Sequence, residues 1–506
     1  MSSNSISYSQ YVLDITFLLP EVFLVTTILS LVLYASLSGA DIRHNFPLQN
    51  RTLSWMGVLT LLLTACLLNN SYLIAEEIII FNGSFVVDYL SLCTKNIIIV
   101  ASIGCFLISQ DYLDRSKLNF FEYYLLTLLS ILGLLLLVSS NDLITAYLAI
   151  EMQSLSFYVL ATFKRESAFS TESGLKYFIL GAFSSGLILF GSSYIYGLTG
   201  SLNFTDLSIL LDGLTFENSF NSFSTLDGLK IFILFIITGL LFKLAAAPFH
   251  MWSPDVYEGA PTSSTAIFAI VPKIAVFVLL IRLFHGSFYN LIDSWQHMII
   301  FSAVISVIIG SFVALKQRKL KRLIAYSAIS HVGYLLLAFS TGTFEGTQSL
   351  FFYMIVYMIT GLATWSIVLS IDSIYGSTKN LSDITALVQI NKVMAITFSL
   401  ILFSLAGVPP LAGFYAKMYV FLVAMSSSFY LPALIAILSS VISTFYYIRV
   451  IKVIYFEKPE GLLFYFPVSQ VTSLVLGTSF FLIVLLFIEP HLVTYYTANM
   501  VSLLGH

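Results

Sequence analysis

The sequence predicts an all-α protein that crosses a membrane many times. Of its 506 residues, 58% are hydrophobic and only 10% are charged, and the mean hydropathy is +0.93. Soluble globular proteins carry about 25% charged residues. The apolar residues are also gathered into runs of the length, about 20 residues, that an α-helix needs to cross a bilayer. No basic face stands out, so we expect no nucleic-acid partner.

About fourteen apolar segments meet that length. In chain order they are 11–34, 52–72, 87–109, 119–139, 143–163, 173–197, 230–247, 262–285, 297–315, 323–341, 349–371, 393–424, 431–452 and 466–488. The seventh and twelfth are predicted to be broken helices, because Pro248 and the Pro409-Pro410 pair lack the N–H that a helix needs. The 198–229 stretch, rich in Ser, Asn, Asp and Gly, is expected to be a loop over one surface.

The distribution of basic residues predicts the topology. Loops that follow odd-numbered segments hold 16 of the 23 Lys and Arg residues, whereas loops after even-numbered segments hold almost none. Basic loops stay on the cytoplasmic side of a bacterial membrane, or on the matrix side in a mitochondrion. We therefore expect both termini on the opposite side.

Ionisable side chains inside the spans are the candidate functional residues. Such groups are costly in lipid and usually face a bundle interior or a hydrated path. Lys243, Lys273 and Lys417 are predicted to lie deep, whereas Lys95 and Lys176, nearer to segment ends, could extend to the interface. The two other candidates are Glu151, interpreted as the only acidic residue well inside a span, and His331, interpreted as the only mid-span histidine.

These groups recur in the same order in two blocks of five segments. Segments 4–8, within 111–290, form the first block, and segments 9–13, within 291–455, form the second; 1–110 and 456–506 flank them. Because five is odd, the second block must insert inverted. Its second segment carries His331 where the first has Glu151, and its fourth carries Lys417 where the first has Lys243. Inverted repeats with interrupted helices are typical of ion-translocating proteins.

No redox centre is expected in this chain. Cys66, Cys93 and Cys105 lie in apolar segments without CxxC spacing, which argues against iron–sulfur clusters and structural zinc. The N-terminus has neither the basic start of a secretory signal nor the arginines of a transit peptide, so synthesis at the site of insertion is expected.

Four stretches carry a resemblance to a known family. They are 242–262 (FKLAAAPFHMWSPDVYEGAPT), 321–334 (KRLIAYSAISHVGY), 345–350 (EGTQSL) and 403–417 (FSLAGVPPLAGFYAK). Together they resemble subunit 2 of NADH:ubiquinone oxidoreductase, or respiratory complex I, an antiporter-like membrane subunit, here of the mitochondrial type. The first stretch is shared by the whole antiporter-like superfamily, and Lys273 and Lys417 favour subunit 2.

The resemblance implies a proton-translocating core subunit of the membrane arm. It would be a non-redox subunit of a proton-translocating NADH:ubiquinone reductase, coupling quinone reduction to proton pumping. In the family pattern Lys243 takes the place of the central lysine, with Lys176 near it and His250 just past the break. The implied proton-translocation residues are Glu151, Lys176, Lys243, His250, Lys273, His331 and Lys417.

The resemblance also implies which cofactors, neighbouring subunits and membrane belong with the chain. The chain would hold no cofactor, with FMN, iron–sulfur clusters and ubiquinone in other subunits, and would contact subunits 4L and 4 and membrane lipids. Its location would be the mitochondrial inner membrane, with both termini on the intermembrane-space side, or alternatively a bacterial plasma membrane. Rival interpretations from the residues alone are an Mrp-type cation/proton antiporter subunit, a passive scaffold and a solute transporter.

Overall fold

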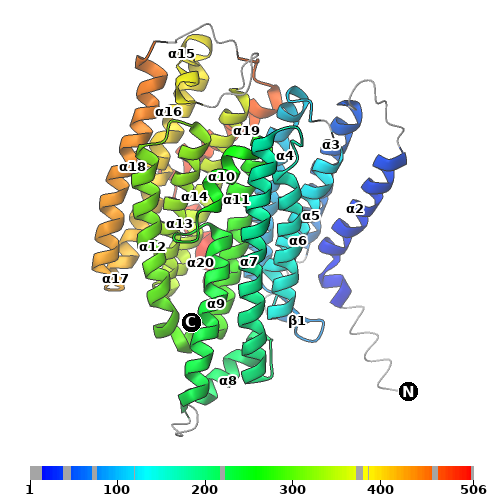
Figure 1. Cartoon of the computed structure of the whole chain (residues 1–506), viewed down its shortest axis with the longest axis vertical. Coiled ribbons are helices and arrows are strands. Elements are labelled where there is room, and N and C mark those ends of the chain that lie inside the picture. Colours follow the sequence, from blue (N-terminus) through cyan, green and yellow to red (C-terminus); the bar gives the residue numbers. More distant parts are fainter. Residues whose placement is uncertain are drawn as a thin grey trace.

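The computed structural model describes residues 14–37, 47–70, 77–118, 120–216, 223–371, 380–385, 387–458 and 465–502. Its long helices run side by side along one direction, with α2 at one edge and α18 at the opposite edge (Figure 1). Within these ranges, 12 helices are long and apolar enough to cross a membrane. The predicted all-α polytopic class is therefore confirmed.

The unbroken long helices follow the predicted segments closely. They are α2 (Leu19–Leu37), α3 (Pro47–Asn70), α4 (Tyr89–Arg115), α5 (Glu122–Ser139), α6 (Leu143–Ala161), α7 (Ala168–Thr199), α11 (Thr262–Leu280), α12 (Ile292–Leu315), α13 (Leu320–Phe339), α14 (Phe344–Ser370), α18 (Tyr430–Phe456) and α19 (Gln470–Ile488). The division into two inverted blocks stays a prediction; the boundary at 110/111 falls inside α4.

The two predicted helix breaks are present. α9 (Phe223–Leu244) ends where Ala245 takes a φ of +59°, and the chain becomes helical again as α10 (Trp252–Gly259). In the second case α16 (Lys392–Ala406) ends at Gly407, whose φ is +83°, and α17 (Ala412–Ser426) follows. Each break leaves backbone groups outside the helical hydrogen-bond pattern, which lipid does not tolerate but a protein interior does.

Several short elements were not predicted. They are the hairpin β1 (Ile78–Ile80) and β2 (Phe85–Val87), α8 (Phe204–Phe216), a π-helical turn (Ile281–Ser287), 3-10 turns (Tyr289–Leu291 and Leu381–Ile384), α15 (Leu387–Ile390) and α20 (His491–Ser502). The expectation of a loop over 198–229 is wrong for α8 and for the start of α9. The apolar residues of α8 explain the helix, because buried Phe204, Leu207 and Leu211 recur at helical spacing.

Contacts between loops separate the two ends of the bundle. At one end, Lys319 pairs with Glu258, Arg449 donates to the Leu315 carbonyl at 2.9 Å, and Arg115 to the Pro467 carbonyl at 2.9 Å. We call this end the basic face. At the other end, Arg282 pairs with Asp88 at 2.6 Å and Gln348 donates to the Thr494 carbonyl at 3.1 Å. These contacts join stretches that follow odd-numbered segments at the first end, and stretches that follow even-numbered segments at the second, as the charge distribution predicts for these described residues.

Burial distinguishes a central helix from peripheral ones. Every residue of α11 is buried, and this helix packs against α4, α5, α6, α9 and α14. By contrast, only about a third of the residues in the most apolar stretch of α2 are buried, and the same holds for α18. A helix that is hydrophobic all round is suited to a protein interior, so α11 and the Lys273 it carries lie at the core.

Candidate functional site

Five of the candidate residues lie on five helices of the bundle. Glu151 is on α6, Lys243 on α9, Lys273 on α11, His331 on α13 and Lys417 on α17. Tyrosine side chains lie between them in two groups, one around Lys243 and one around His331.

Lys243 and Glu151 face each other without touching. Lys243 is the penultimate residue of α9, and its Nζ lies 3.5 Å from the hydroxyl of Tyr158. Tyr158 follows Glu151 by seven residues on α6, which puts both on one helical face. The Glu151 carboxylate accepts a hydrogen bond from Ser154 Oγ at 3.4 Å, and its other oxygen is buried without a partner. The two groups are close enough to interact electrostatically.

Lys273 is held by one tyrosine. Its Nζ donates to the Tyr357 hydroxyl at 2.9 Å, and the ammonium lies 4.9 Å from the centre of the same ring. Both contacts favour a cation, one through the oxygen lone pair and the other through the ring face. Tyr357 comes from α14, so this pair joins the central helix to the second half of the chain.

His331 is enclosed by tyrosines. Its Nδ1 lies 2.7 Å from the Tyr353 hydroxyl and its Nε2 lies 3.3 Å from the Tyr447 hydroxyl. The Tyr357 ring centre is 5.4 Å from the imidazole centre. The sequence analysis did not single out these tyrosines. A signal was present, because Tyr353 and Tyr357 are four residues apart and share one face of a predicted helix.

Lys417 lies against the second helix break. Its Nζ donates to the carbonyl of Ala406, the last residue of α16, at 2.8 Å. A Cβ at position 407 would come within 2.8 Å of the Lys417 side chain, and the backbone there has positive φ, so the position requires glycine. A cavity of about 10 Å³ lies between Lys417, Tyr357 and His331. This volume is near the minimum that holds one water molecule.

The structure places Lys176 and His250 apart from this series. The Lys176 side chain is 45% exposed, and its Nζ lies 2.9 Å from both Asp255 and Glu172. Burial alone would raise the pKa of the Asp255 carboxyl, but Lys176 and Arg322 together hold that pKa below its usual range. His250 is buried in the first break, and its Nδ1 has no partner. Lys176 therefore belongs to the basic face rather than to the surroundings of Lys243.

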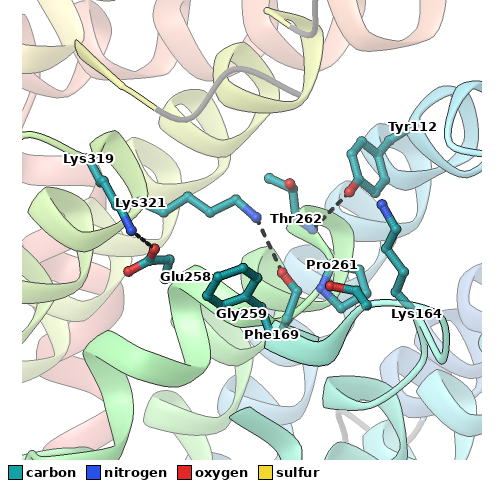
Figure 2. A pocket seen from close by; sticks show the side chains of 11 residues that line it. Tyr112, Lys164, Phe169, Glu258, Gly259, Pro261, Thr262, Lys319 and Lys321 are labelled. Atoms are coloured by element: carbon teal, nitrogen blue, oxygen red, sulfur yellow. Dashed lines mark hydrogen bonds and ion pairs between the residues drawn. The ribbon is translucent and has the colours of Figure 1, made fainter. Parts of the chain in front are cut away.

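A cavity of about 160 Å³ opens on the basic face beside the start of α11. Figure 2 shows Lys319 bonded to Glu258, Lys321 to a backbone carbonyl, and the Thr262 amide to the Tyr112 hydroxyl. Lys164 lines the same cavity. The cavity therefore brings Lys164, Lys319 and Lys321 close to the first residues of α11, the helix that carries Lys273.

One buried pair corrects the sequence analysis. Lys95, expected to extend to the interface, is 1% exposed and forms an ion pair with Glu21 of α2 at 2.5 Å. Glu21 is itself 3% exposed, so Glu151 is not the only acidic residue inside a span. The partners are 74 residues apart in sequence, and no local pattern links them.

Two broken helices, each with a lysine beside its break, and a fully buried central helix in the same bundle define an antiporter-like membrane subunit. The sequence profile of the family described as NADH:quinone oxidoreductase/Mrp antiporter, transmembrane, matches residues 140–443. The chain belongs to this family, and within it to the antiporter-like subunits of NADH:quinone oxidoreductase, respiratory complex I.

Individual relatives support that assignment. NADH-ubiquinone oxidoreductase chain 2 of Marchantia polymorpha is 42% identical over 94% of this chain and 96% of its own length. NADH-quinone oxidoreductase subunit N of Pelagibacter ubique is also 42% identical, over 88% of this chain and 91% of its own. A chain of respiratory complex I from Thermus thermophilus superposes with a TM-score of 0.76 at 27% identity, covering 95% of this chain and 99% of that one. The relatives therefore include a bacterial protein, and all of them match nearly end to end.

Proposed function

We propose that this chain is a proton-translocating core subunit of the membrane arm of NADH:ubiquinone oxidoreductase, coupling quinone reduction to proton pumping. The observation that supports the proposal is a series of Glu, Lys and His side chains on five helices of one bundle. Glu151 and Lys243 are half-buried, and Lys273, His331 and Lys417 are buried. Aligned single charges suit protons better than a bulky solute.

The electrostatic interaction between Glu151 and Lys243 is the proposed point of control. A carboxylate near a buried ammonium favours its charged form. If the charge at Glu151 is lost or displaced, Lys243 releases its proton to Lys273, and the proton passes on to Lys417, with His331 beside the route. The two groups do not form an ion pair, so no direct bond has to be broken for this to happen.

Energy for the transfer comes from other subunits. Moving one charge against 100 mV costs about 2.3 kcal/mol. The described part of the chain has no cluster of three His, Cys, Asp or Glu residues able to hold a metal. In our proposal FMN, the iron–sulfur clusters and the ubiquinone site belong to the rest of the complex, and this chain is its non-redox proton path.

Protons enter from the basic face in this scheme. Its cavity at the start of α11 supplies an opening, Lys176 and Asp255 supply charge on the same face, and His250 lies in the first break, seven residues after Lys243. We place the basic face toward the mitochondrial matrix, or the cytoplasm of a bacterium, with subunits 4L and 4 and lipids as neighbours within the membrane.

The experiment is Lys243→Ala in the assembled complex, reconstituted in liposomes. Proton uptake per NADH oxidised is measured in this variant and in the control variant Lys230→Ala. Lys230 lies on the same helix as Lys243 but outside the series. We expect the rate of proton translocation to fall more than about tenfold in the first variant, as for the loss of a proton-transfer group, and to stay near the native rate in the second. Full stoichiometry in Lys243→Ala would contradict the proposal.

An Mrp-type cation/proton antiporter subunit is the second candidate, because the family description covers both kinds of protein. Purification separates them: a complex I subunit comes with flavin and iron–sulfur subunits, whereas an antiporter subunit does not. The names of the relatives reported above favour the first.

A further inference from the structure

We propose that Tyr357 is a catalytic residue that passes the proton from Lys273 to Lys417. This inference rests on the proposed function and adds a residue that the charge-based analysis leaves out. Tyr357 lies on α14, between the central helix α11 and the helix α17 that carries Lys417.

The first argument is the contact with the donor. The Lys273 ammonium gives a hydrogen bond to the Tyr357 oxygen at 2.9 Å. The hydroxyl hydrogen of Tyr357 therefore points elsewhere, and the structure directs it to the Ala269 carbonyl at 3.4 Å, one helical turn before Lys273. This second bond is long, so little opposes rotation of the hydroxyl hydrogen.

The Tyr357 side chain also borders a small cavity. Tyr357 lines the water-sized cavity that Lys417, Thr360 and Ser404 also line. A water molecule needs two to four polar partners to occupy such a site, and four of the side chains that line this one carry a polar group. His331 borders the same cavity, but both its nitrogens already face Tyr353 and Tyr447. The Lys417 amine is therefore the base that receives the proton.

The transfer balances without electron movement. One N–H bond of the Lys273 ammonium breaks as an O–H bond forms at Tyr357. The original O–H bond of Tyr357 breaks as its hydrogen passes to the water, and the water gives a hydrogen to the neutral amine of Lys417. Tyr357 and the water end neutral, and one positive charge has moved from α11 to α17.

The hydroxyl also works as a switch. With its hydrogen on the Ala269 carbonyl, Tyr357 holds Lys273 but makes no link to the cavity. With its hydrogen toward the cavity, the link to Lys417 is complete. A hydroxyl can donate one hydrogen and accept two, so rotation alone changes the state.

The test separates the hydroxyl from the ring. Tyr357→Phe keeps the ring against Lys273 and removes only the oxygen. Tyr357→His fits the shape less well but restores a group that accepts and donates protons. Tyr123→Phe, which removes the hydroxyl of a buried tyrosine on α5, is the matched control.

All variants are assembled in the complex, and NADH-driven proton uptake is measured in liposomes. We expect the translocation rate to fall about tenfold or more in Tyr357→Phe, as for a lost proton-transfer group, to recover in part in Tyr357→His, and to stay native in Tyr123→Phe. A native rate in Tyr357→Phe overturns the proposal, and so does an equal loss in the Phe and His variants, since that pattern reports packing.

If the complex with Tyr357→Phe does not assemble, a second variant tests the same relay. Thr360→Val keeps the shape of the cavity wall and removes a polar partner of the water, so a rate several-fold below native supports the relay and a native rate overturns it. Failure of the tyrosine relay can be told apart from failure of the proposed function. If Lys243→Ala stops pumping while Tyr357→Phe does not, the series stands and only the tyrosine relay falls.

Discussion

Two Glu–Lys combinations that join different membrane helices in the described part of the chain are arranged differently. Lys95 and Glu21 are in contact at 2.5 Å, with side chains no more than 4% exposed. Lys243 and Glu151 are not bonded to each other; Lys243 faces Tyr158, and Glu151 accepts from Ser154. The same two residue types thus form a closed pair at the edge of the bundle and an open pair inside it.

In our proposal the difference separates a structural pair from a functional one. In the closed pair each charge cancels the other, and the contact ties α2 to α4. In the open pair the carboxylate acts on the ammonium through space, so either group can change its charge without first breaking a bond. We infer that contact distance, rather than the presence of buried charge, identifies the groups that handle protons.

The largest expected effect is on the closed pair. Lys95→Met leaves Glu21 buried without its partner, which typically costs about 3–5 kcal/mol. The measurement is the free energy of unfolding of the purified subunit in detergent. The double variant Glu21→Leu/Lys95→Met removes both charges and should recover most of the loss. Equal destabilisation in the single and double variants would show that the contact is not a structural pair.

The open pair should respond in activity instead of stability. Glu151→Gln keeps the shape and removes the charge that acts on Lys243, so we expect proton translocation to fall about tenfold, equivalent to ~1.4 kcal/mol of barrier. Unfolding should be nearly unchanged, because no bond to Lys243 is lost. Translocation is measured in liposomes, with Glu151→Asp as the charge-conserving control. Native translocation in Glu151→Gln would remove the distinction between the two pairs.

The smallest effect is expected at the exposed pair of the basic face. In Lys176→Gln the translocation rate should change by less than about twofold, because exposed ion pairs are screened by water and salt. Asp255 also keeps Arg322 as a partner. Rates are compared at low and high ionic strength. A tenfold fall at both would instead place Lys176 in the proton path, as the family resemblance implies.

Particular residues show how far the sequence could predict this structure. The helical segments and both breaks were predictable, because apolar runs and prolines act locally. Lys243, Lys273 and Lys417 were visible as charges within apolar runs. The Glu21–Lys95 contact was not, since it joins helices far apart in the chain and Lys95 lies near a segment end.

The tyrosines around His331 escaped prediction for another reason. The chain has 29 tyrosines, and a tyrosine in an apolar segment is compatible with lipid, core or interface. Only the packing of α13, α14 and α18 shows that Tyr353, Tyr357 and Tyr447 meet at one imidazole. Residues whose role depends on what they touch need the tertiary structure.

The bond from Lys417 to the Ala406 carbonyl has a further consequence. The free carbonyls at the end of a helix act as roughly half a negative charge, so α16 serves Lys417 as a counter-ion made of backbone. A carboxylate counter-ion loses its negative charge when it is protonated, whereas a backbone carbonyl does not take up a proton and keeps its partial charge. Its strength depends only on the distance between α16 and α17. In our proposal Lys417 therefore responds to helix movement, whereas Lys243 responds to the charge of a neighbouring acid.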